Sequence, residues 1–268
     1  MVEMSTAHGL HLVPGGEQGA GIVVLLHPVG LDLTFWDRQI EVLAGNYQVV
    51  AVDLPGHGLS EKVSGGAGDV IADTAGRVVA ALDELGYEKV HLIGHSFGGM
   101  IALHLAVAAP KRLASLGLLS TASTFSDGTR DFMRGHADQV RENGMVTVLP
   151  SIPQWVAETT ALRRPDIVDR LEKSVLTTDP DAYAAAWDAI AAFDLLDSLD
   201  SIDVPTLVLV GDRDVNTPVS DSVLLEQRIH RAELGVISEA SHLITLDSPE
   251  QVNARLVSFL ATVSSCAR

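Results

Sequence analysis

The stretch that most constrains the fold of this chain is residues 89–109, KVHLIGHSFGGMIALHLAVAA. Val90, Leu92 and Ile93 read as a short buried strand, and apolar residues recur at helical spacing from Met100 onward. Between them the pentapeptide Gly-His-Ser-Phe-Gly places Ser96 at a sharp strand-to-helix turn. The sequence therefore predicts a strand-turn-helix unit that carries one hydroxyl at the carboxyl edge of a sheet.

The two glycines around Ser96 have a steric purpose in such a turn. Neighbouring chain passes so close that a Cβ atom at position 94 or 98 would clash. The hydroxyl would also lie over a helix N-terminus, whose free N–H groups favour a developing negative charge. These properties suit a nucleophile, although a glycine-rich turn with an incidental serine has the same pentapeptide.

Two later loops supply the groups that would activate a serine. A predicted strand at 206–210 leads into a loop with Asp212 and Asp214, and a predicted strand at 234–237 leads to His242. The order serine, acid, histidine is typical of a serine nucleophile in the middle of an α/β chain. Because the carboxyl ends of parallel strands meet at one sheet edge, we expect these three loops to converge there.

Five motifs together resemble the α/β-hydrolase family, over nearly the whole chain. They are LLHPVG at 25–30, DLPGHGLS at 53–60, GHSFGG at 94–99, GDRD with TP at 211–214 and 217–218, and ASH at 240–242. Asp32, Trp36 and TDPDAY at 178–183 are similar to the 3-oxoadipate enol-lactonase branch. The resemblance implies the α/β-hydrolase fold, with a mostly parallel central sheet flanked by helices and a helical lid after the sixth strand.

The resemblance also implies which acid completes a catalytic triad with Ser96 and His242. The family's acid is the fourth residue of the Gly-x-x-Asp element, which corresponds to Asp214, and Asp212 is expected to brace the loop. The predicted strand at 113–119 ends in Ser-Thr and has no carboxylate, so it cannot supply the acid as it does in some relatives.

An oxyanion hole made of two backbone N–H groups is implied in the same way. By similarity to the family, Val29 supplies one N–H and Phe97, the residue after the nucleophile, supplies the other. Pro28 stands where the family usually has glycine. It has no N–H to donate, but the Val29 N–H remains available. The loop at 53–58, with His57, is expected to be structural.

From 122 to 199 the strand pattern stops and helical patterns replace it. Helices are predicted at 131–143, 153–161, 165–177 and 180–193. The chain thus divides into an α/β-hydrolase core, residues 1–121 and 200–268, and a helical lid insert, residues 122–199. Lids exclude water and shape the substrate pocket.

Aromatic residues make up only 4% of the chain, and many of them lie in the predicted lid. Trp155 and Trp187 are our candidates for substrate-binding residues, against the alternative that they only pack the lid on the core. A lactone that carries a carboxylate would need a cation in the pocket. Arg130 and Arg134 are the candidates, and the alternative is that both face solvent.

Composition excludes several other classes of function. The formal net charge of -17 disfavours nucleic acid or an anionic membrane surface as partner. The single cysteine, Cys266, excludes a disulfide framework, and we expect no metal and no cofactor. The N-terminal residues have no signal-peptide pattern, so we expect a cytoplasmic protein with a small-molecule substrate and leave its oligomeric state open.

The expected activity is hydrolysis of a small, mainly apolar carboxylic ester or lactone through an acyl-enzyme. Three alternatives remain at this stage: a carbon–carbon bond hydrolase, a cofactor-free perhydrolase or haloperoxidase, and a ligand-binding receptor on a hydrolase scaffold. An epoxide hydrolase or dehalogenase is disfavoured because each needs an aspartate where Ser96 stands. Near the N-terminus only residues 10–13 are expected to form a strand, so the usual leading pair of strands would be curtailed.

Overall fold

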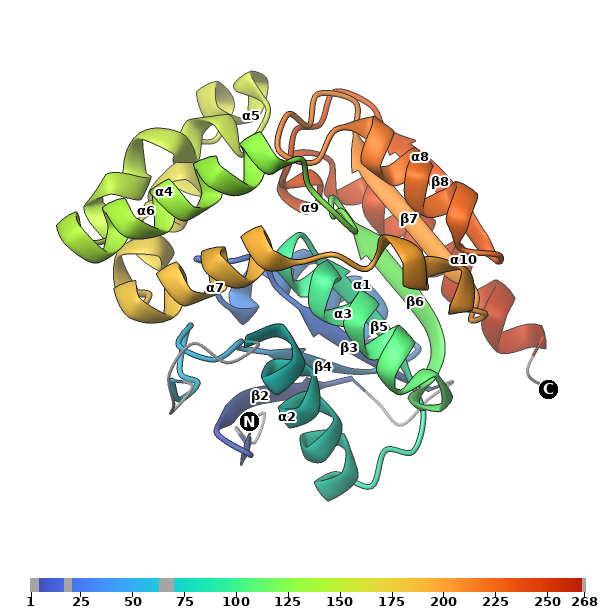
Figure 1. The fold of residues 1–268 in the computed structure, drawn as a ribbon. Helices are drawn as coiled ribbons and strands as arrows, with labels where there is room; N and C mark the ends of the chain where they lie inside the picture. Colours follow the sequence, from blue (N-terminus) through green and yellow to red (C-terminus); the bar gives the residue numbers. More distant parts are fainter. Residues whose placement is uncertain (1–4, 17–20, 63–69, 267–268) are drawn as a thin grey trace.

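The fold is built on one eight-stranded sheet. A computed structural model describes residues 5–16, 21–62 and 70–266 of the chain. The strand order is β1-β2-β4-β3-β5-β6-β7-β8, and all pairs from β4 to β8 are parallel (Figure 1). The strands are β1 (Ser5–Ala7), β2 (Leu10–Gly15), β3 (Ile22–Leu26), β4 (Gln48–Val52), β5 (Val90–His95), β6 (Leu113–Leu119), β7 (Thr206–Gly211) and β8 (Ala232–Ile237).

The N-terminal edge differs from the expectation drawn from the sequence. A leading pair of antiparallel strands is present, because β1 pairs with β2 and β2 pairs with β4. The sequence argument missed β1 because it has only three residues, too few for a hydrophobic alternation to appear. His8 and Gly9, both with positive φ, form the turn between the two strands.

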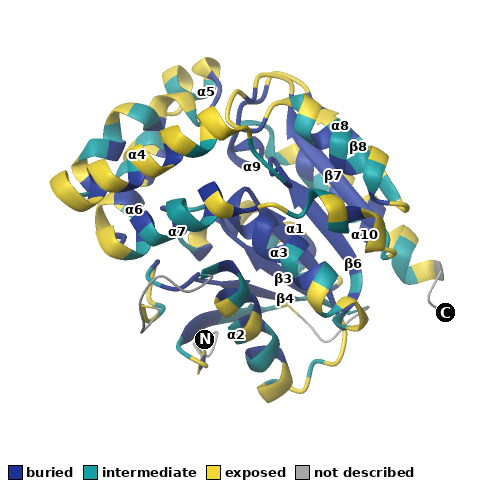
Figure 2. Cartoon of the chain, viewed as in Figure 1, coloured by how far each residue is buried: buried dark blue, intermediate teal, exposed yellow. Residues whose placement is uncertain are grey.

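Helices cover both faces of the sheet. The core helices are α1 (Asp37–Leu43), α2 (Val70–Glu84), α3 (Phe97–Ala108), α8 (Val219–Arg228), α9 (Ile244–Asp247) and α10 (Pro249–Cys266), with 3-10 helices η1 (Leu33–Trp36), η2 (Pro110–Arg112) and η4 (Leu196–Ser201). One buried cluster joins α2, α3 and α8 to the sheet, and a second joins α1 and α10 to its other face. Figure 2 shows the central strands buried and the outer helix faces exposed.

Helices α4 to α7 follow β6 and lie together beside the core (Figure 1). They are α4 (Asp127–Asn143), α5 (Glu158–Arg163), α6 (Pro165–Thr177) and α7 (Pro180–Ala192), with η3 (Met145–Gln154) between α4 and α5. The helix predicted at 153–161 is wrong in its bounds. Pro150 and Pro153 lack a donor N–H and sit within a 3-10 helix, and the α-helix starts only at Glu158.

The topology itself selects one place for a site. The chain runs from β3 to β4 on one side and later returns to β5 on the other side of β3. Ligands of open α/β sheets bind outside the carboxyl ends of the strands where the strand order reverses in this way. Ser96 follows β5 and His27 follows β3, so both lie at that reversal. The prediction of the α/β-hydrolase fold is confirmed by this sheet and its flanking helices.

Candidate active site

Ser96 occupies a strained turn between β5 and α3. Its φ of 51° and ψ of -115° lie outside the regions that a residue with a side chain prefers, at a cost of about 1–3 kcal/mol. The turn is held by a bond from the Ser96 N–H to the Leu119 carbonyl (2.8 Å) and by one from Thr121 Oγ1 to the Ser96 carbonyl (2.8 Å). A Cβ atom at Gly94 or Gly98 would overlap backbone atoms of Gly98 and Leu26, respectively, as the sequence predicted.

Three side chains from three loops form one hydrogen-bonded chain at the sheet edge. Ser96 Oγ lies 3.0 Å from Nε2 of His242, and Nδ1 of His242 lies 2.9 Å from Oδ2 of Asp214. A carboxylate only accepts, so Nδ1–H of His242 donates to Asp214 and Nε2 is left to accept the Ser96 proton. The structure therefore brings together the serine, histidine and aspartate that the sequence singled out.

The Asp214 carboxylate is held ionised by its surroundings. Burial alone would raise its pKa, but the charge and hydrogen bond of His242, with bonds from Thr217, lower the pKa to about 2. Thr217 donates from its N–H to Oδ1 (3.0 Å) and from its hydroxyl to Oδ2 (2.9 Å). The sequence argument gave Thr217 no role. An aspartate whose carboxylate accepts from backbone N–H groups a few residues later is nevertheless a common feature of turns. Asp212 accepts from the Ala240 N–H, as expected of a bracing residue.

The loop after β3 carries Val29, which lines the same cavity as Ser96. His27 orders this loop, because its Nε2 accepts from the Leu54 N–H (2.9 Å) and its Nδ1–H donates to the Pro28 carbonyl (2.7 Å). Within the described residues, the N–H groups of Val29 and Phe97 donate no hydrogen bond. Two free N–H groups near a nucleophile are what an oxyanion hole needs.

Helices α6 and α7 and Thr178 between them contact this loop directly. Gly30 has a φ of 77°, and a Cβ atom there would lie 2.8 Å from the ring of Tyr183 on α7. Ser174 on α6 donates to Asp32 Oδ2 (2.8 Å), and the Thr178 hydroxyl donates to the Gly30 carbonyl (3.3 Å). The loop that carries Val29 is thus held both by its bonds beside the sheet and by contacts with α6 and α7.

A cavity of about 80 Å³ opens on Ser96 and His242. Trp155 and Trp187, the predicted substrate-binding residues, both line it. The segment between β6 and β7 contributes five side chains to its wall: Phe125, Met133, Trp155, Trp187 and Ile190. A larger cleft of about 780 Å³ lies on the other side of α7, against α2 and α3, and neither Ser96 nor His242 lines it. The smaller cavity is the one that contacts the hydrogen-bonded chain.

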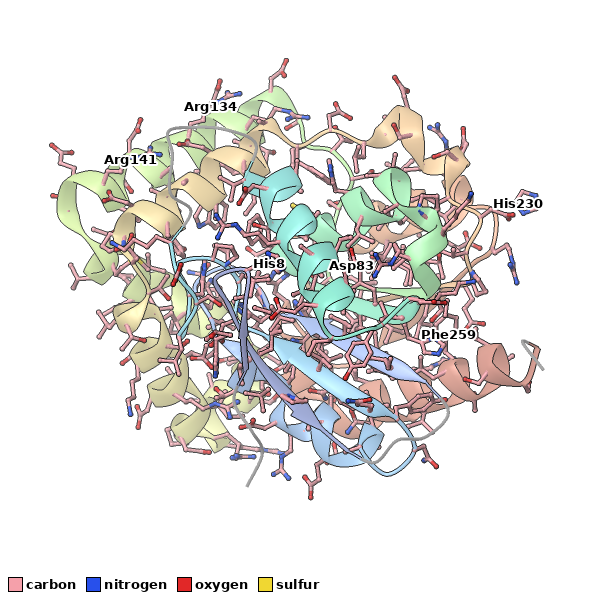
Figure 3. The ribbon with its side chains drawn as sticks, turned by 90° about the horizontal axis from the view of Figure 1, so that it is seen from below. His8, Asp83, Arg134, Arg141, His230 and Phe259 are labelled. Atoms are coloured by element: carbon pink, nitrogen blue, oxygen red, sulfur yellow. The ribbon has the colours of Figure 1, made fainter. Side chains whose placement is uncertain are left out.

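Arg130 is not a pocket residue, contrary to the expectation from the sequence. Its guanidinium donates to the carbonyls of Phe125 (2.9 Å) and Ala191 (2.6 Å) and to Thr124 Oγ1 (3.1 Å). These bonds turn the side chain away from the cavity, where it joins the start of α4 to the end of α7. Arg134 pairs with Asp131, and Figure 3 shows it on the outside of the lid.

The ring of His95, the residue before Ser96, packs against that of His242. The ring centroids are 5.5 Å apart at 84°. Burial, followed by the nearby His242, lowers the pKa of His95 well below its ordinary value. The imidazole of His95 is therefore neutral, packs against the ring of His242 and places no positive charge beside it. Burial also lowers the pKa of His27 and lowers that of His57 to about 3.

Among residues 5–16, 21–62 and 70–266, no cluster of three or more His, Cys, Asp or Glu side chains is placed to hold a metal ion. In the same residues, no helix has both the length and the apolar character needed to cross a membrane.

A family model described as alpha/beta hydrolase fold matches residues 21–249. The chain belongs to the α/β-hydrolase family. This α/β-hydrolase is 29% identical to 3-oxoadipate enol-lactonase 1 of Acinetobacter baylyi over 237 residues, 88% of this chain and 87% of the relative. The resemblance to the enol-lactonase branch is thereby confirmed.

Two solved structures are close to this α/β-hydrolase. The enol-lactonase from Burkholderia xenovorans LB400 aligns with a TM-score of 0.87 and 27% identity, over 94% of this chain and 96% of that one. A thermophilic esterase from Thermogutta terrifontis aligns with a TM-score of 0.88 and 29% identity, over 98% of each chain.

Proposed function

We propose that this protein is a serine hydrolase that cleaves small, mainly apolar carboxylic esters or lactones through an acyl-enzyme. The observation that carries the proposal is the 3.0 Å contact between Ser96 Oγ and His242 Nε2, with His242 bound to Asp214, at the wall of an apolar cavity. A nucleophile, its base and the base's orienting acid are the parts that acyl transfer requires.

In the first half-reaction, Ser96 Oγ attacks the carbonyl carbon while His242 Nε2 takes the hydroxyl proton. The carbonyl oxygen becomes an oxyanion, which the free N–H groups of Val29 and Phe97 stabilise. As the carbonyl reforms, the C–O bond of the ester breaks and His242 returns the proton to the leaving oxygen. An acyl group then remains on Ser96, and the alcohol is released or, for a lactone, stays attached to the acyl chain.

In the second half-reaction, His242 removes a proton from a water molecule that attacks the acyl carbon. The same two N–H groups stabilise the second oxyanion, and His242 protonates Ser96 Oγ as the acyl bond breaks. The products are the carboxylic acid and a free enzyme. Asp214, which stays ionised, stabilises the imidazolium in both steps.

The relatives support this choice of chemistry. A 3-oxoadipate enol-lactonase and an esterase are both similar to this chain over most of their length. Lactones and esters share the acyl carbon–oxygen bond, so one site performs the same two steps on either. By similarity to these relatives and from its sequence, we propose that it acts in the cytoplasm on a small molecule without a cofactor.

Ser96→Ala tests the proposal. We expect turnover of 4-nitrophenyl butyrate to fall by about 1,000-fold or more, because the nucleophile is lost while the cavity stays. Mass spectrometry of quenched wild-type enzyme should find the butyryl group on the peptide that contains Ser96. Far-ultraviolet circular dichroism and the melting temperature serve as folding controls. Turnover by Ser96→Ala at the wild-type rate, with the fold intact, would contradict the mechanism.

A further inference from the structure

The cavity beside Ser96 has an uncharged wall. Met133 on α4 and Trp187 and Ile190 on α7 face it from the lid, and Met100 faces it from α3. Within the part of the chain that the structure describes, no Lys, Arg, Asp or Glu lines it. Apart from the reacting groups Ser96 and His242, the lining side chains that carry polar atoms are Asn216, Thr217 and the indoles of Trp155 and Trp187, and Thr217 is already bonded to Asp214. A bound acyl group therefore meets mainly carbon atoms.

Arg130, one of the two cations that the sequence offered for a carboxylate, is committed elsewhere. The Arg130 side chain is 13% exposed, and its bonds to Phe125, Ala191 and Thr124 are joined by a contact to Asp194 (3.3 Å). Moving the guanidinium into the cavity would break its bonds to the carbonyls of Phe125 and of the buried Ala191, which opposes the movement. Arg130 thus closes the base of the lid and is not free to bind a ligand.

An anionic acyl chain would be unfavourable in this cavity for two reasons. A carboxylate that leaves water for this wall loses its hydration and gains no positively charged partner among the lining residues. The protein's formal net charge of -17 also repels an anion on its approach. An acyl chain that ends in a methyl group has neither disadvantage, and its burial against apolar side chains is favourable.

Resting on the function proposed above, we infer that the site takes uncharged acyl groups of short chain and rejects acyl groups with a free carboxylate. The cavity volume of about 80 Å³ limits the length of the acyl chain, because this volume is far below the roughly 300–1,000 Å³ of pockets that hold drug-sized ligands. The natural substrates are then neutral short-chain esters or unsubstituted small lactones.

A matched pair of esters tests this inference on the wild-type enzyme. 4-Nitrophenyl butyrate and mono-4-nitrophenyl succinate share the leaving group and the acyl chain length, and differ in a terminal methyl against a carboxylate. We expect kcat/KM to favour the butyrate by about 100-fold or more. The spontaneous rate of each ester is measured with Ser96→Ala and subtracted.

The two proposals fail in different ways in this experiment. A preference for butyrate of less than tenfold, or any preference for the succinate ester, overturns the charge selectivity alone. Turnover of neither ester overturns the hydrolase function and, with it, the inference that rests on it.

Two variants identify the groups responsible. Arg130→Gln should lower both rates by the same factor and leave their ratio unchanged, because the side chain only supports the lid. A selective loss of succinate turnover would instead make Arg130 a carboxylate-binding residue and overturn the inference.

Met133→Lys places an ammonium at the wall and should narrow the butyrate preference by about tenfold or more compared with Met133→Gln. Equal ratios in these two variants would also contradict the inference.

Discussion

Among the residues that the structure describes, two buried histidine–aspartate pairs are found, and one of these two meets a nucleophile. In one, His242 Nδ1 lies 2.9 Å from Asp214; in the other, His11 Nδ1 on β2 lies 2.7 Å from Asp53 at the end of β4. The pairs are alike in chemistry, distance and burial. They differ in what the second imidazole nitrogen contacts, which is Ser96 Oγ for His242 and, among the described residues, no hydrogen-bond partner for His11.

The two aspartates also accept hydrogen bonds from different parts of the chain. Asp53 accepts from the N–H groups of Leu33 (2.7 Å) and Leu59 (2.9 Å), and so joins the segment after β3 to its own loop. The bonds to Asp214 from Thr217 stay within its own loop and orient the carboxylate toward His242. A histidine–aspartate pair is therefore a structural unit by itself, and it becomes a candidate catalytic unit only beside a hydroxyl and a cavity.

The largest expected difference is between the histidines. His242→Gln should lower kcat for 4-nitrophenyl butyrate by about 10,000-fold or more, because the general base is lost. His11→Gln should leave kcat within about threefold, since His11 contacts no reacting group. Stopped assays on the two purified variants, compared at equal folded fraction, check both values. A comparable loss of kcat in His11→Gln would show that the second pair also takes part in the reaction.

The aspartates should separate activity from stability. We expect Asp214→Asn to lower kcat by about 1,000-fold or more, because the amide no longer orients and stabilises the imidazolium. Asp53→Asn should instead lower the free energy of unfolding by about 1–3 kcal/mol through weakened bonds to Leu33, Leu59 and His11, with kcat nearly unchanged. Urea denaturation and initial rates measured on the same preparations test the contrast. If Asp53→Asn loses activity without losing stability, the contrast is wrong.

As the pH falls, the stability contributed by the loop that contains Asp53 should be lost at a higher pH than the stability contributed by Asp214. His57, in that loop, has a pKa lowered by burial from 6.5 to about 3, so the unfolded chain binds more protons between these values. Stability from this group is therefore complete above pH 6.5 and falls by about 1.4 kcal/mol per pH unit below it. For Asp214 the corresponding loss begins only below pH 3.8 and extends to about pH 2. Unfolding curves at several pH values should show a smaller slope for His57→Gln, and an unchanged slope would refute the assignment.

The smallest expected effect concerns Thr217. Thr217→Val keeps the shape and removes the hydroxyl that donates to Asp214 Oδ2 (2.9 Å). Because the other bonds to Asp214 remain, we expect kcat to fall by only about three- to tenfold, the scale of one hydrogen bond of about 1 kcal/mol. A loss as large as that of Asp214→Asn would mean that Thr217 has a direct role.

The sequence by itself was sufficient for the strands β5, β6, β7 and β8 and for the order serine, acid, histidine. Long apolar runs and glycine-rich turns are local signals, so the turn at Ser96 and the loops of Asp214 and His242 could be found without coordinates. The three-residue β1 and the break at Pro150 and Pro153 are too short or too ambiguous for such signals.

Only the tertiary structure decided which polar groups face the cavity. Sequence spacing placed Arg130 at the start of the lid, but its direction depends on the carbonyl of Ala191, sixty-one residues later, and on Phe125. Likewise, the contrast between His242 and His11 depends on where Ser96 lies after folding. The physical reason is that a side chain's direction is set by hydrogen-bond partners and packing from distant segments, which no local pattern of residues contains.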